Sequence, residues 1–181
     1  VFGKHNLANM EGARIVCGKL GISDARFYDA IRTFKGAGRR LELVAKNATQ
    51  AVFRDFAHSP SKLKATISAV KEQFPDRKLI ACFELHTFSS LNEAFLSQYE
   101  KTMDESDVAM VYFNPEVIAH KKIKPITQKQ VLECFGRQDM LVLTDPNALL
   151  SSILTAFGPG SVLLMMSSGS FDGIKVEEIL K

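Results

Sequence analysis

The feature that most constrains the fold is the alternation of short apolar runs with segments of helical periodicity, which continues from Leu41 to the end of the chain. Apolar residues at helical spacing predict helices, and short apolar runs between turn residues predict buried strands. The predicted strands are 41–45, 51–55, 78–83, 108–113, 140–144 and 161–166. The predicted helices are 61–71, 92–103, 127–135, one that begins at Asn147 and one that begins at Ile174.

This alternation predicts an α/β protein with a doubly wound, mostly parallel six-stranded sheet. Nearly continuous apolar strands, such as 162–166, are typical of a sheet that helices cover on both faces. The first two strands flank a tight turn at 47–49 and predict a hairpin. One strand of the sheet is therefore expected to be antiparallel.

Two further helices are predicted before the sheet. The first spans Ala8–Leu20, and the second follows Ser23, which suits a helix N-cap. Two short helices cannot form a core alone, so we expect residues 1–35 to be the C-terminal helices of a preceding domain. The flexible run 35–38 predicts a hinge, and 36–181 a second domain.

The chain begins with Val1 rather than methionine, and we expect it to be a piece of a longer protein. In such a piece the apolar faces of the two leading helices lose the partner on which they packed. This predicts that the piece self-associates through these two helices.

Composition excludes several function classes. The net charge of +3 is too small to indicate nucleic-acid binding, and the lysine-rich segment 120–124 fits a solvated loop better than a polyanion site. No apolar run reaches the about 18 residues that a membrane span needs, and there is no signal-peptide pattern. Cys17, Cys82 and Cys134 lie apart among apolar residues without a CxxC pair. They indicate buried thiols, a cytoplasmic protein and no metal site.

The stretch 54–60 joins a predicted strand to a predicted helix through a turn that carries an acid and an imidazole. Asp55 lies at the carboxyl end of the strand, where open α/β sheets bind ligands, beside a helix amino terminus that offers free amide donors. Ser59 suits the helix cap and Pro60 its first turn. The alternative, which the sequence supports equally, is that Asp55 and His58 only stabilise a surface turn.

Polar residues also flank the first helix and the hinge. His5, Asn6 and Asn9 stand at the start of that helix, where the spacing places two carboxamides on one face, able to read a base or ribose edge. Capping of the helix by Asn6 explains the pattern nearly as well. Arg39 and Arg40 follow the hinge and could hold phosphate, with a salt bridge to Glu42 as the alternative.

Two loops, 84–90 and 167–173, follow the third and the last strand and are expected at the same edge of the sheet. Their hydroxyls and glycines allow backbone amides to approach a ligand, although each loop taken singly is equally well a simple turn. The candidate residues in them are Glu84, His86, Thr87, Ser89, Ser167, Ser168, Gly169 and Phe171. The sequence contains no GxxxxGK[ST], GxGxxG or GxSxG motif, so it offers only half of a nucleotide site.

Three segments, 3–9, 34–42 and 55–60, resemble in order and spacing the Mur ligases, the ATP-dependent amide-forming enzymes of peptidoglycan synthesis. The rest of the chain is similar to the Rossmann-like carboxyl-terminal domain of that family. Arg39-Arg40 and the Asp-Phe-Ala-His form resemble the members that act on UDP-N-acetylmuramate. The run 166–173 is similar to the glycine-rich tail of the murein tripeptide ligases.

This resemblance implies an activity for the full-length protein. ATP, with Mg²⁺, phosphorylates the carboxylate of UDP-N-acetylmuramate, and the amine of L-alanyl-γ-D-glutamyl-meso-diaminopimelate attacks the acyl phosphate, in peptidoglycan recycling. The phosphate loop, magnesium ligands and modified lysine of the family lie in its central domain, so the chain alone is expected to be inactive. The alternatives are L-alanine as the amine, and a nonenzymatic nucleotide-binding module.

The resemblance also implies roles for residues. His5, Asn6 and Asn9 line the adenine side, Arg39 and Arg40 belong to the nucleotide site with Arg40 reaching the phosphates, Asp55 binds the ribose hydroxyls, and His58 supports that loop. The loops 84–90 and 167–173 face the peptide. Two positions depart from relatives: Ser59 stands where many have a histidine, and His86 stands where the tripeptide ligases carry an arginine.

Overall fold

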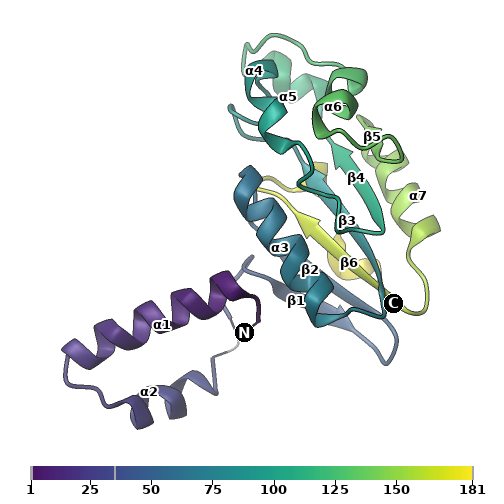
Figure 1. The fold of residues 1–181 in the computed structure, drawn as a ribbon. Coiled ribbons are helices and arrows are strands. Elements are labelled where there is room, and N and C mark those ends of the chain that lie inside the picture. The colour runs from purple at the N-terminus through teal and green to yellow at the C-terminus, as the bar shows by residue number, and fades with distance from the viewer. Residues whose placement is uncertain (1, 35, 181) are drawn as a thin grey trace.

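The computed structural model describes residues 2–34 and 36–180, and a six-stranded sheet forms its centre (Figure 1). The strands are β1 (Glu42–Lys46), β2 (Ala51–Asp55), β3 (Lys78–Glu84), β4 (Val108–Tyr112), β5 (Leu141–Leu143) and β6 (Ser161–Met166). The helices are α1 (Lys4–Lys19), α2 (Asp24–Ile31), α3 (Pro60–Gln73), α4 (Glu93–Leu96), α5 (Pro115–His120), α6 (Gln128–Phe135) and α7 (Pro146–Ala156). Short 3-10 turns lie at Ser97–Tyr99, Phe171–Gly173 and Val176–Glu178.

The strand order β1-β2-β6-β3-β4-β5 confirms the predicted mixed sheet. β1 is antiparallel to β2, and every other neighbouring pair is parallel. Asp55 of β2 and Phe83 of β3 both pair with Met166 of β6, and Glu84 pairs with Tyr112 of β4. The carboxyl ends of four strands therefore lie level, and the loops that leave them meet at one edge.

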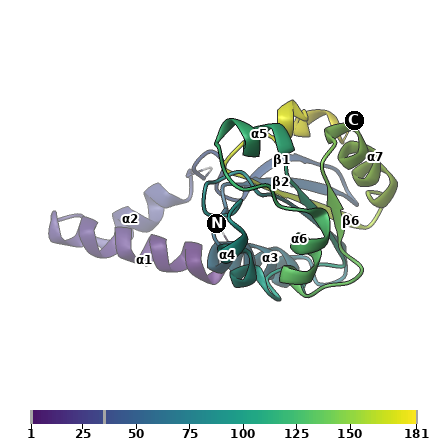
Figure 2. The ribbon, with the colours of Figure 1, turned by 90° about the horizontal axis from the view of Figure 1, so that it is seen from above.

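Helices cover both faces of the sheet, and each face has its own core. On one side Leu63 and Ile67 of α3 pack with Phe135 of α6, and on the other side Leu149 and Ile153 of α7 pack on the sheet. Seen from above, α3 and α7 lie on opposite sides of the strands (Figure 2). Burial on both faces explains why the strands are almost continuously apolar.

The helix pair α1 and α2 projects away from the sheet (Figure 1). Its attachment is at the start of α1, where the Phe2 ring packs edge-on against Phe53 at a centroid distance of 5.7 Å. A Cβ at Gly3, whose φ is 86°, would lie 2.7 Å from Ala69 Cβ, so the chain enters α1 in close contact with α3. Farther along, α1 has no buried residue, and Leu20 is 76% exposed.

Two predicted helices are wrong. The run 92–103 forms only α4 and a 3-10 turn, because the Tyr99 ring stacks on Phe135 and Lys101 takes a left-handed backbone with a φ of 57°. The tail from Ile174 forms one 3-10 turn at Val176–Glu178. The apolar residues of this tail pack into the core beside α7 while the chain is largely extended. The same residues could not all face this core from one side of a helix.

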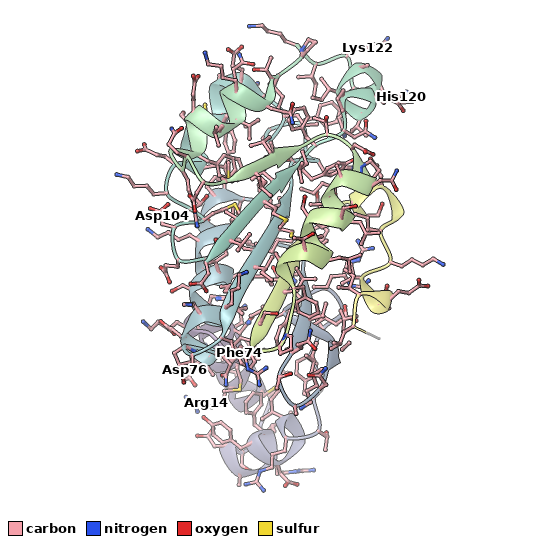
Figure 3. All side chains as sticks on the ribbon, turned by 90° about the vertical axis from the view of Figure 1, so that its right-hand side faces the viewer. Arg14, Phe74, Asp76, Asp104, His120 and Lys122 are labelled. Atoms are coloured by element: carbon pink, nitrogen blue, oxygen red, sulfur yellow. The ribbon has the colours of Figure 1, made fainter. Side chains whose placement is uncertain are left out.

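The segment around α5 was not predicted as a helix. Asn114 caps it by accepting a hydrogen bond from the Glu116 backbone N–H at 2.7 Å, and Pro115 occupies its first turn. The basic segment 120–124 follows this helix. One of its lysines, Lys124, forms an ion pair with Glu93 at 2.6 Å. His120 and Lys122 lie at the end of the molecule opposite Arg14 of α1 (Figure 3).

The cysteine prediction is wrong for two residues. Cys82 is buried in β3, and burial raises the pKa of its thiol, whereas Cys17 and Cys134 are partly exposed.

No helix among the described residues is long and apolar enough to cross a membrane.

Replacing Thr127 with alanine should lower the free energy of unfolding by about 1 kcal/mol, the usual cost of losing a helix cap. Thr127 Oγ1 accepts from the Gln130 N–H at 3.2 Å, and Gln130 Oε1 accepts from the Thr127 N–H at 2.8 Å. Thr155→Ala is the matched control, because the exposed Thr155 hydroxyl only donates back to Ser151 within α7. Urea titration measures both variants, and equal losses would contradict the capping role.

Candidate functional site

The candidate site is centred on Asp55, at the carboxyl end of β2. Asp55 is 7% exposed, and its carboxylate accepts hydrogen bonds from the backbone N–H of Leu41 at 2.6 Å and of Ala57 at 2.7 Å and from the Thr66 hydroxyl at 3.5 Å. Its backbone carbonyl accepts from the Ser167 N–H at 3.0 Å. Asp55 therefore joins the chain entering β1, the turn after β2 and the loop after β6.

His58 lies on the turn itself. Its Nδ1 is 2.9 Å from the Phe56 carbonyl oxygen, and its own carbonyl accepts from the Tyr99 hydroxyl at 2.7 Å. Because a carbonyl oxygen only accepts, Nδ1 carries the proton. Ser59 occupies the N-cap position of α3 without a side-chain cap, so its hydroxyl does not have the capping role that the sequence predicted.

A cleft of about 1220 Å³ opens between the helix pair, the sheet and α3. Most of the predicted nucleotide residues line it, namely His5, Asn6, Asn9, Arg40 and Asp55. Apolar walls come from Phe2, Met10, Ile31, Phe34, Phe53 and Phe74. A cleft with apolar walls and a few convergent polar groups is the usual form of a small-molecule site.

Asn6 does not cap α1, so that alternative is wrong. The N-cap is Gly3, and the Asn6 side-chain amide donates to the Phe2 carbonyl at 3.0 Å. This bond uses the nitrogen of the carboxamide and leaves its oxygen as an acceptor in the cleft.

Arg39 and Arg40 point to different places. Arg40 lines the cleft, and its guanidinium has no partner among residues 2–34 and 36–180. Arg39 lines a separate cavity of about 150 Å³, where its Nη1 donates to the Gly169 carbonyl at 3.5 Å.

The salt bridge suggested for Glu42 forms with another arginine. Arg54 Nη2 lies 3.2 Å from Glu42 Oε2, while the backbone N–H of Arg39 donates to the same oxygen at 2.8 Å. The Arg39 N–H and then the Arg54 guanidinium hold the pKa of the Glu42 carboxyl below its usual range. Glu42 therefore forms no salt bridge with the guanidinium of Arg39 or of Arg40.

The two predicted peptide loops meet at the same edge of the sheet. Glu84 accepts from the Ser167 hydroxyl and from the Phe171 N–H at 2.9 Å, and all three residues are buried. His86 is half-buried, and its ring lies against Gly169. The Thr87 hydroxyl bonds the Ser89 and the Ser90 hydroxyl, while the Ser168 hydroxyl is buried without a partner in the described part of the chain.

Two residues of this edge, Tyr112 and Asn114, were missed by the sequence analysis. Tyr112 and Asn114 both donate to Asp172 Oδ2, the latter at 2.6 Å. Burial and then the bond to Asp172 raise the pKa of the Tyr112 phenol. The position of Tyr112 and Asn114 at the end of β4 was a usable signal, because Glu84 was selected on the same ground at the end of β3.

The described residues contain no group of three or more His, Cys, Asp or Glu that could hold a metal ion. Mg²⁺ commonly binds through one or two carboxylates together with substrate phosphates, and no chemical step at this site is assigned to it.

A family model described as Mur ligase, glutamate ligase domain, matches residues 39–169. The chain belongs to the Mur ligase family. The match begins at Arg39 and ends at Gly169, so it covers the sheet, the Asp55 turn and the start of the loop after β6. Mur ligases are ATP-dependent ligases of peptidoglycan synthesis, and they form carbon–nitrogen bonds.

Curated relatives and solved structures agree with this membership. The UDP-N-acetylmuramate–L-alanine ligase of Lactococcus lactis is 32% identical over 125 residues, covering 67% of this chain and 28% of the relative. The UDP-N-acetylmuramate–alanine ligase of Thermotoga maritima has a TM-score of 0.74 at 21% identity, covering 95% of this chain and 36% of that one. A murein peptide ligase of Psychrobacter arcticus has a TM-score of 0.62 at 24% identity, with coverages of 99% and 38%.

At these identities the two structural matches establish the fold. The chain spans 28% to 38% of the length of these Mur ligases.

Proposed function

We propose that the protein to which this chain belongs is an ATP-dependent ligase that joins UDP-N-acetylmuramate to the murein tripeptide L-alanyl-γ-D-glutamyl-meso-diaminopimelate in the cytoplasm. The observation that carries the nucleotide part is the cleft that gathers His5, Asn6, Asn9, Arg40 and Asp55. In this proposal the nucleotide binds between the helix pair and the sheet domain. The peptide binds at the neighbouring edge, formed by the loops after β3 and β6.

Each side chain of the cleft has a chemical role in this proposal. The Asn6 carboxamide oxygen and Asn9 hydrogen-bond the adenine edge, and His5 lies against the base. Beside its bonds to Leu41, Ala57 and Thr66, the Asp55 carboxylate keeps acceptor capacity on Oδ2, which accepts from the ribose hydroxyls. The Arg40 guanidinium, which has no partner in the described part of the chain, binds the phosphates, for which its planar fork of donors is suited.

The choice of amine rests on two opposing observations. The likeness to a murein peptide ligase supports the tripeptide. The 32% identical relative is named an L-alanine ligase, so L-alanine is the second candidate.

The assay compares the two amines in the complete ligase with ATP and UDP-N-acetylmuramate. Phosphate release measures the rate, and mass spectrometry identifies the product. We expect kcat/KM for the tripeptide to be about 100-fold above that for L-alanine, because a site built for polar groups rejects an analogue that lacks them. A preference for L-alanine would establish the second candidate, and no amide with either amine would refute the ligase proposal.

We also propose that residues 1–35 and 36–181 are two domains that move about the hinge at 36–38, with Lys35 outside the described residues. α1 is attached at its start and exposes most of its length, which supports this division. Closure of such domains excludes water that would hydrolyse an acyl phosphate. The exposed apolar side chains of the pair, which include Ile15, Val16 and Leu20, are the surface proposed for self-association of the isolated chain.

Limited proteolysis tests the boundary. The first cut should fall between residues 34 and 40, because Gly36, Ala37 and Gly38 are exposed and lie outside every helix and strand. A first cut within 41–181 would place the boundary elsewhere.

A further inference from the structure

The loop that follows β6 holds an unfavourable backbone shape. Phe171 and Asp172 are successive non-glycine residues in the left-handed region, each with a φ of 50°. For L-residues this conformation is disfavoured, and it persists only where surrounding groups hold it. The shape of this loop therefore depends on contacts from outside it.

The end of β3 supplies one of these contacts through Glu84. Its Oε2 accepts from the Phe171 N–H at 2.9 Å and from the Ser167 hydroxyl, and Ser167 Oγ in turn accepts from the Gly169 N–H at 2.6 Å. One carboxylate oxygen thus holds both ends of the turn. Glu84 is 3% exposed, and it forms no ion pair within residues 2–34 and 36–180. In the described part of the chain its side-chain hydrogen-bond partners, Ser167 and Phe171, both belong to the loop after β6.

The end of β4 supplies the second contact. Tyr112 and Asn114 donate to the Asp172 carboxylate, the latter at 2.6 Å, so the second left-handed residue is held as well. The buried ring of Phe171 lies beside Tyr112, with centroids 6.4 Å apart. The loop is therefore fastened to the sheet at two successive residues.

The loop held in this way fits closely against His86. A Cβ at Gly169 would lie 2.8 Å from Glu84 Oε2 and 2.8 Å from His86 Cδ2. This distance is shorter than any normal carbon contact, so the backbone of the loop and the imidazole have no space between them. A change in how Glu84 seats the loop would move the loop surface beside His86.

We propose that Glu84 is a positioning residue, which folds the Ser167–Gly173 loop against His86 and so shapes the surface that receives the peptide amine substrate. This inference rests on the proposed function for the identity of that substrate. Glu84 acts through its hydrogen-bond acceptor oxygen and does not contact the peptide. The rival role for a buried carboxylate at this edge is recognition of a cationic amine of the peptide by charge.

Replacement by alanine and by glutamine separates the two roles, because glutamine keeps an acceptor oxygen and loses the charge. In the complete ligase Glu84→Ala should raise the KM for the tripeptide about tenfold with the KM for ATP unchanged, while Glu84→Gln stays within about threefold of wild type. Equal damage from alanine and glutamine would overturn the positioning role in favour of charge recognition. An unchanged KM in Glu84→Ala would overturn both.

A second variant displaces the loop without altering Glu84. Gly169→Ala puts a methyl group against Glu84 and His86 and should reproduce the rise in KM for the tripeptide. Gly158→Ala is the matched control, because a Cβ at Gly158 meets nothing within 4 Å. Equal kinetics for the two alanine variants would contradict the close fit.

A measurement on the 181-residue chain keeps this inference separate from the proposed function. Amide hydrogen exchange of Phe171 should be slow in the wild type and in Glu84→Gln, and at least about tenfold faster in Glu84→Ala, with the β3 amides unchanged. Fast exchange in the wild type, or slow exchange in all three proteins, would refute the role of Glu84. A complete ligase without tripeptide activity would refute the proposed function, and the exchange result would still decide the inference.

Discussion

Replacing Asp55 with alanine should raise the KM for ATP of the complete ligase about 10- to 150-fold. A charge-assisted hydrogen bond contributes about 1.5 to 3 kcal/mol, and every 1.4 kcal/mol corresponds to tenfold in affinity. Asp55 lines the cleft and is 7% exposed, so water screens such a bond poorly. Steady-state kinetics with saturating UDP-N-acetylmuramate and tripeptide measure the change.

The same carboxylate also holds the backbone N–H groups of Leu41 and Ala57, so the variant loses stability as well as ribose contacts. Asp107→Ala is the matched control. Asp107 Oδ2 accepts from the Leu79 backbone N–H at 2.6 Å and pairs with Lys71 at 2.7 Å, and Asp107 does not line the cleft.

Both variants should unfold at lower urea concentration than the wild type, because each leaves a backbone N–H without its acceptor. Only Asp55→Ala should change the KM for ATP. An unchanged KM in Asp55→Ala, or an equal rise in Asp107→Ala, would show that Asp55 acts on the turn alone.

The second large effect concerns the isolated 181-residue chain, which should show no turnover, in contrast to the complete ligase. The 181 residues contain no GxxxxGK[ST] loop to cradle the phosphates, and their described part holds no metal-ligand cluster. We therefore expect neither ATP hydrolysis nor amide formation above the background of a preparation from the empty vector. A sensitive phosphate assay and mass spectrometry of the product measure the two reactions.

The isolated Asp55→Ala chain, purified in parallel, separates true activity from contamination. Turnover that disappears in this variant would belong to the chain and would refute the prediction. Turnover that is equal in both preparations would come from a contaminant.

The sheet was predictable because its strands are short, buried apolar runs between turn residues, a pattern that fits few structures other than a strand. The predicted bounds 51–55 and 161–166 agree with β2 and β6, and the hairpin at 47–49 follows from local turn chemistry. Helices whose ends depend on distant contacts were not predictable. The run 92–103 fails as a helix because Tyr99 turns toward Phe135 and His58, which lie far away in the sequence.

The candidate site was predictable in location but not in detail. Polar residues at the carboxyl ends of strands indicated the edge, since strand order alone brings such ends together. The divergence of Arg39 and Arg40 depends on the left-handed backbone of Arg39, with a φ of 56°, for which the sequence has no signal. The contact between Glu84 and Phe171 joins residues 87 positions apart.

The most direct test of the proposed nucleotide site is a crystal structure of the complete ligase with a nonhydrolysable ATP analogue. We expect the ribose hydroxyls within hydrogen-bond distance of the Asp55 carboxylate, the adenine beside His5 and Asn9, and a phosphate oxygen on the Arg40 guanidinium. A nucleotide bound outside the cleft, with Asp55 bonded only to Leu41, Ala57 and Thr66, would contradict the account.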